Sequence, residues 1–145
     1  MGRADNLRAS FYLEISMKHA LLTSLTGACF LIAGTAWAAD LGAEITNAQT
    51  HANLAAQSGT INAVHTHMHH ALNCLVGPAG EGFDAAQMNP CAKVGAGAIP
   101  DSTNAGQKTK LEAAKAQLVQ GIAATDLKAA QDAANSAQAT IASAK

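Results

Sequence analysis

The chain has little charge and very few aromatic side chains. Of its 145 residues, 13% are charged and 3% are aromatic, and the formal net charge is −1. Nucleic acids and anionic membrane surfaces are recognised by clustered Lys and Arg, so this composition argues against both. Three cysteines are too few for a small scaffold held by disulfides. A composition rich in Ala and poor in aromatic and β-branched residues favours helices over strands, in one small domain.

The N-terminal region has the pattern of a secretory signal peptide that begins at Met17. Lys18 supplies the positive charge, residues 20–34 carry no charge, and Ala36-Trp37-Ala38 places small residues at −3 and −1 of a cleavage site. The apolar stretch is short for a membrane span. We therefore expect residues 17–38 to be a signal peptide that is cleaved after Ala38, and residues 1–16 to be a non-native upstream extension.

Residues 39–145 form the expected mature domain, which would fold in the periplasm or outside the cell, away from the membrane. They contain six lysines, eight acidic residues and no arginine, and Phe83 is their only Phe, Tyr or Trp. With no arginine and one aromatic ring, these residues offer few side chains that could bind phosphates or stack on bases. We expect no nucleic-acid partner.

Hydrophobic periodicity predicts an all-α fold: a small four-helix bundle made of two helical hairpins. The first hairpin joins helices at 41–58 and 61–76, with Gly59 as a left-handed C-cap and Thr60 as an N-cap. The second joins a helix at 110–122 to one that Thr125 caps. The similar turns of the two hairpins indicate an internal duplication.

A long loop, 77–109, connects the two hairpins and is rich in Gly, Pro, Asn and Asp. Such a loop is unusual in a compact domain unless it is tied down or functional. Cys74 and Cys91 offer a tie, because a lone pair of cysteines in an oxidising compartment usually forms a disulfide. Metal ligation by the two thiolates is the alternative.

Five histidines fall within 20 residues, and residues 39–145 contain no others: His51, His65, His67, His69 and His70. On a helix, His65 and His69 lie about 60° and 100° to one side of the apolar stripe and form an i, i+4 pair that can chelate one ion. His67 falls on the opposite flank, and His70 faces away from the core. We therefore favour His65 and His69 as metal ligands.

His51 can join this pair only if the chain turns at Gly59. An antiparallel hairpin that pivots there places residue 51 level with about residue 67. The favoured site is then His51, His65 and His69 between the first two helices, with His67 and His70 as further candidates. Met68 belongs to the apolar stripe and is a soft ligand only as a second choice.

Imidazole-rich sites suit copper, nickel and zinc, and intrinsic affinity favours copper. No carboxylate lies in the histidine window, which argues against calcium and magnesium. A His–Met haem site would need bulky apolar walls, which this Ala-rich chain lacks. The run from His65 to His70 differs from the H-x-H-x-D-H motif of metallo-β-lactamase-like hydrolases, because His69 replaces the Asp. We expect no enzyme.

The signal peptide, the hairpin around Thr50-His51-Ala52 and residues 65–71, and the Ala/Leu repeat at 111–141 together resemble the small metal-binding protein family. The resemblance covers about residues 41–76 and 107–145. It implies a periplasmic, histidine-rich helical bundle linked to copper and other divalent metals. The second hairpin has Gln131 and Asn135 but no histidine, so the resemblance implies metal sites in the first hairpin only.

The sequence thus predicts a periplasmic transition-metal-binding protein for metal buffering, delivery or sensing. The alternatives are a protein-interaction bundle with a pH-sensitive histidine face and, ranked last, a haem carrier. A homodimer or a complex with a protein partner is compatible with either of the first two.

Overall fold

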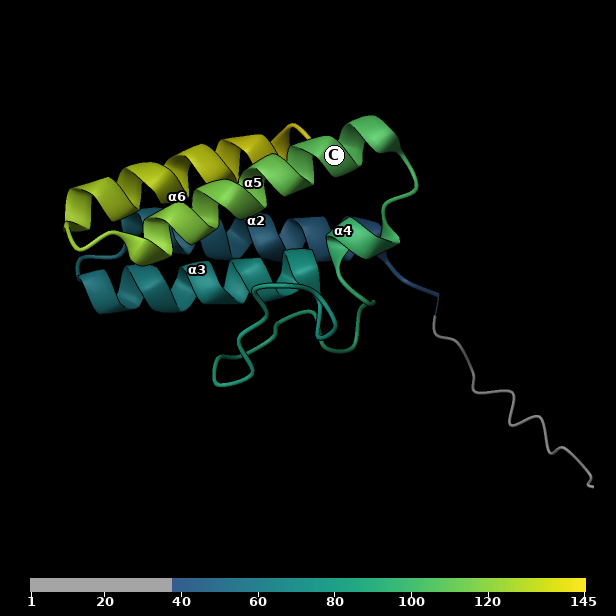
Figure 1. Ribbon diagram of the computed structural model, residues 1–145, viewed down its shortest axis with the longest axis horizontal. Coiled ribbons are helices and arrows are strands. Elements are labelled where there is room, and N and C mark those ends of the chain that lie inside the picture. Colours follow the sequence, from purple (N-terminus) through teal and green to yellow (C-terminus); the bar gives the residue numbers. More distant parts are fainter. Residues whose placement is uncertain (1–37) are drawn as a thin grey trace, which may run out of the picture. The chain divides into compact units, whose positions relative to one another are not determined.

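The computed structural model describes residues 38–145. The expected extension at 1–16 and nearly all of the expected signal peptide at 17–38 lie outside the described residues. Within the described range every regular element is a helix: α2 (Leu41–Gln57), α3 (Ile61–Val76), α4 (Ala98–Asp101), α5 (Ala105–Ala123) and α6 (Leu127–Ala142) (Figure 1). None of these helices is both long enough and apolar enough to span a bilayer. The predicted all-α fold is confirmed.

The first hairpin, α2–α3, has a polar cap at the start of each helix. Asp40 Oδ1 accepts a hydrogen bond from the Ala43 amide at 2.9 Å, and Thr60 Oγ1 accepts one from Ala63 at 3.3 Å. These side chains satisfy amides that have no partner inside the helix, so the predicted Thr60 cap is confirmed. The predicted left-handed conformation of Gly59 is wrong. The chain leaves α2 through Ser58 in an extended conformation, and Gly59 is not among the glycines with positive φ.

The second hairpin, α5–α6, also starts at short polar side chains. Helix α5 begins at Ala105 instead of 110, because Asn104 Oδ1 accepts the Gln107 amide at 2.9 Å and caps an additional turn. Helix α6 is capped by Asp126, whose Oδ1 accepts the Ala129 amide at 2.9 Å, and Thr125 does not serve as its cap. In both helices the start is fixed by an Asn or Asp side chain that the prediction did not use as the cap.

The two hairpins pack against each other, α2 on α6 and α3 on α5, as Figure 1 shows. The contacting faces of α2 and α6 consist mainly of alanine, and Ala52 and Ala134 are fully buried within them. Small side chains allow helix axes to approach closely. The largest fully buried aliphatic side chains come from all four long helices: Ile45, Met68, Leu75, Leu111, Leu118 and Ile141.

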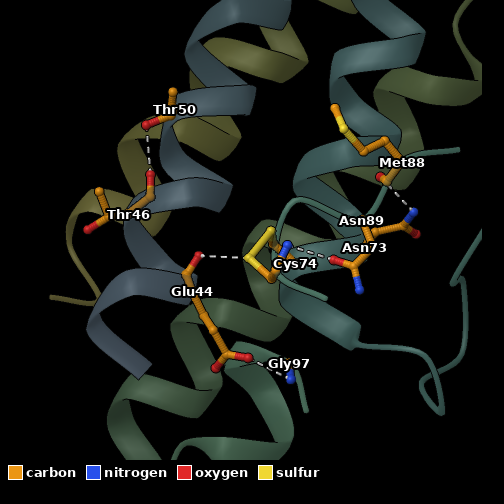
Figure 2. Close-up of a disulfide and its surroundings, with 9 residues drawn as sticks. Glu44, Thr46, Thr50, Asn73, Cys74, Met88, Asn89 and Gly97 are labelled. Atoms are coloured by element: carbon orange, nitrogen blue, oxygen red, sulfur yellow. Dashed lines mark hydrogen bonds between the residues drawn. A yellow bond between two sulfur atoms is a disulfide. The ribbon is translucent and has the colours of Figure 1, made fainter. Parts of the chain in front are cut away.

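The connection between the hairpins is anchored at several points and contains the short helix α4. The predicted disulfide between Cys74 and Cys91 is present, and both cysteines are buried (Figure 2). The fully buried Asn73 binds the backbone of Asp84 on both sides: its Nδ2 donates to the Asp84 carbonyl and its Oδ1 accepts the Asp84 amide, each at 2.9 Å. The connection is therefore held firmly against α3.

Candidate metal centre

Three histidine side chains meet between α2 and α3. One ring nitrogen from each of His51, His67 and His70 lies within 4.8 Å of the others. The Nδ1 atoms of His51 and His67 are 3.5 Å apart. The ring centroids are separated by 5.1 Å for His51 and His70, and by 5.7 Å for the other two pairs. We call these three residues the histidine triad.

The hairpin geometry explains why His51 meets His67. Helix α2 ends at Gln57 and α3 begins at Ile61, so residues equally distant from Gly59 lie at the same level. Residues 51 and 67 are each eight positions from that turn. The structure confirms that His51 and His67 face each other across the hairpin. His70 lies one turn further along α3, on the same flank as His67.

The predicted orientation of His70 is wrong. Its side chain is 7% exposed and belongs to the buried surface of α3. The large aliphatic side chains of α3 define only part of that surface. Ala71 and Cys74, both fully buried, extend it toward the flank that carries His67 and His70. A prediction that uses only the large apolar residues of α3 therefore assigns the wrong face of the helix to the contact with α2.

The other two histidines have partners outside the triad. His65 Nε2 donates to the Ala124 carbonyl at 3.0 Å and so connects α3 to the turn between α5 and α6. His69 Nδ1 lies 3.3 Å from Asp84 Oδ2, in the connection between the hairpins. That contact lacks hydrogen-bond geometry, so it stabilises the pair only when His69 is protonated. The favoured set of His51, His65 and His69 is thus not the set that the structure brings together.

Met68 is a core residue. It is fully buried, and its Sδ and Cε atoms pack against Gly121 of α5, where an added Cβ would leave no room for them. The thioether is committed to helix packing, in agreement with its place in the apolar stripe.

Burial makes His51 and His70 favour their uncharged forms. Desolvation is the main reason that the pKa of His51 lies below its usual 6.5, and protonated His70 and His67 would lower it further. The pKa of His70 is lowered first by desolvation and then by His67 and His69. Neutral imidazole is the form that coordinates a metal, so these two side chains need little or no deprotonation at neutral pH to become ligands.

One pair of the triad has the nitrogen spacing that a small tetrahedral ion requires. Nitrogen ligands about 2.0–2.1 Å from a tetrahedral metal are separated from one another by roughly 3.4 Å. The His51–His67 separation of 3.5 Å already matches that value. His70 Nδ1 is buried and, within the described residues, has no hydrogen-bond partner, which normally costs free energy. Coordination to a bound ion would give His70 Nδ1 the partner that it lacks.

Three further polar residues have structural roles that the sequence pattern did not predict. Asn73 and Asp84 hold the connection near His69, and Glu44 is completely buried on α2. Glu44 has a recognisable signal, because it lies four residues before Ala48 on the apolar face of α2. The partners of Asn73 come from the connection, whose path has no periodicity to predict it.

Comparisons with protein-family models, with curated proteins and with solved structures gave no match for this chain. The resemblance to the small metal-binding protein family is therefore carried by the sequence features alone.

Proposed function

We propose that this chain binds one transition-metal ion through His51, His67 and His70. Copper is the preferred ion, and nickel and zinc are the alternatives, because an all-imidazole site suits these metals and intrinsic affinity is highest for copper. The observation that supports this is the meeting of three ring nitrogens within 4.8 Å, two of them on side chains whose pKa is lowered.

The scaffold in this proposal is a small four-helix bundle in which two hairpins support one site. The pairwise packing of α2, α3, α5 and α6 supports it. The cellular setting is the periplasm or the cell exterior, which the buried Cys74–Cys91 disulfide supports through its need for an oxidising compartment. The role is buffering, delivery or sensing of the metal, without catalysis.

Calorimetric titration of Cu(II) into the metal-free protein tests the proposal. We expect one ion per chain with submicromolar affinity. The double variant His51→Gln/His67→Gln should lose that affinity by at least about 100-fold, as it removes two of three ligands. The matched control is His65→Gln/His69→Gln, which keeps the triad and changes the same number of imidazoles. Equal loss in both variants would contradict the assignment of the site.

Thermal unfolding provides an independent measure. A ligand that binds only the native state stabilises it by about 2.7 kcal/mol at a free concentration 100 times its Kd. We expect copper to raise the melting temperature of the wild type and of the control, but not of the triad variant. If copper, nickel and zinc all leave the wild type unchanged, a protein-interaction bundle is the better description.

A further inference from the structure

A second cluster of titratable groups lies at the opposite end of α2 from the triad. The Glu44 side chain is completely buried, and its Oε1 accepts a hydrogen bond from the Gly97 amide at 2.8 Å (Figure 2). Asp101 Oδ2 accepts the preceding amide, that of Ala96, at 2.7 Å. Two successive amides of the connection therefore each bind one of the two carboxyl groups.

The two carboxyl groups are close to each other. A Cβ added to Gly95 would lie closer than 3.0 Å to both Glu44 Oε1 and Asp101 Oδ2. Two ionised carboxylates in such an arrangement repel, and one shared proton removes the repulsion. Glu44 Oε2 is buried and has no hydrogen-bond donor within the described residues. A proton held between Glu44 and Asp101 would join the two carboxyl groups by a hydrogen bond.

We propose that Glu44 and Asp101 share a proton and together form a latch that holds segment 94–101 on the first turn of α2 and loosens as the pH rises. The segment is also bound at its start, where the Asp40 amide donates to the Val94 carbonyl at 3.0 Å. Asp101 lines a cavity of about 670 Å³ together with residues 92–96, which gives the shared proton a route to solvent.

The charges around Glu44 favour its protonated form. Asp101 at the end of α4 and Asp40 before α2 are the charged groups that act on it, and both are acidic. The pKa of Glu44 is raised to about 7, mainly by burial and further by the two aspartates, while the hydrogen bond from the Gly97 amide opposes the rise. When the latch is open, Glu44 loses its proton with a pKa of about 4.5, and when it is closed, with a pKa of about 7. Between these two values the proton is held only by the closed latch, so closure weakens as the pH rises from 4.5 to 7. Above pH 7 it changes no further.

Hydrogen exchange of the Ala96 and Gly97 amides, followed by NMR on the full chain, tests the latch. The measured quantity is the protection factor, so that the intrinsic pH dependence of exchange is removed. We expect protection to fall about 100-fold between pH 4.5 and 7.5, as the shift of the Glu44 pKa requires. In Glu44→Gln the amide side chain can accept from Gly97 and donate to Asp101 without titrating, so protection should not vary with pH.

The matched control is Glu112→Gln, an exposed change of the same kind on α5, which should behave as the wild type does. The carboxyl ¹³C shift of Glu44 in the wild-type protein gives a second readout that needs no variant. A midpoint near 7 supports the latch. A midpoint near 4.5, or an equal fall of protection in Glu44→Gln, would overturn it.

Discussion

The Nδ1 atoms of His51 and His67 lie 3.5 Å apart although sixteen residues separate them in the sequence. Both residues sit at the same distance from the turn at Gly59, so the antiparallel hairpin alone brings them together. His70 then adds a third nitrogen from the next turn of α3. This arrangement leads to predictions on metal release, and other contacts lead to predictions on stability.

Acid should release the metal. Each imidazole must be neutral to coordinate, and burial holds the pKa of His51 and His70 below 6.5. Affinity for Cu(II) should therefore fall as the solution is acidified from pH 7.5 to 5, with more than one proton taken up for each ion released. Titrations at pH 5, 6 and 7.5 would show this. Equal affinity at pH 5 and 7.5 would count against imidazole ligation.

The disulfide should contribute to stability without contributing to the metal site. Cys74 and Cys91 are 17 residues apart, and closing a loop of that length removes about 3 kcal/mol of conformational entropy from the unfolded chain in the chain-entropy treatment. Cys74→Ala/Cys91→Ala should lower the free energy of unfolding in urea by about that amount and should leave copper affinity unchanged. If the free energy of unfolding falls by less than about 1 kcal/mol, the hydrogen bonds of Asn73 are enough to hold the connection in place without the disulfide.

Met68 should be replaceable by another apolar side chain. Because its sulfur packs on Gly121, Met68→Leu should cost less than about 1.5 kcal/mol, whereas Met68→Ala should cost about 2–5 kcal/mol by leaving a cavity. Copper binding by Met68→Leu should match that of the wild type, for Cu(I) as well as Cu(II). A tenfold loss of Cu(I) affinity in the leucine variant would instead identify the thioether as a ligand.

The buried histidines and the buried Glu44 should change the free energy of unfolding in opposite directions as the pH falls. His51 and His70 have lowered pKa values, so their contribution is present above pH 6.5 and is lost as the pH falls below it. Glu44 has a pKa raised to about 7, so its contribution is present below pH 4.5 and is lost as the pH rises toward 7. Acidification from pH 7 to 5 should therefore destabilise Glu44→Gln more than the wild type.

Urea unfolding of the metal-free proteins at both pH values measures this difference. The exposed variant Glu112→Gln serves as the reference, because its carboxyl group is not buried. A pH dependence of Glu44→Gln that equals the wild type would show that Glu44 is ionised in the folded protein across this range.

Much of the helical organisation follows from local sequence features. The helix positions, the Thr60 cap, the Cys74–Cys91 disulfide and the level of His51 opposite His67 depend on periodicity, capping and chain geometry. The set of histidines that meet did not follow, because the contact face of α3 is extended by Ala71 and Cys74, whose small side chains carry little weight in a hydrophobic pattern. The Glu44–Asp101 pair depends on the path of the connection, which no periodicity describes.

The location of the whole triad within one hairpin limits how much of the chain must be ordered to bring the three side chains together. Between His51 and His67 the chain needs to close a loop of only sixteen residues, for which the length-dependent entropy cost is about 2.5 kcal/mol. Ligands from α2 and α6 would require the closure of a much longer loop. If the triad binds a metal as proposed, the ion can join α2 to α3 before the second hairpin packs, and metal capture becomes an early step of folding.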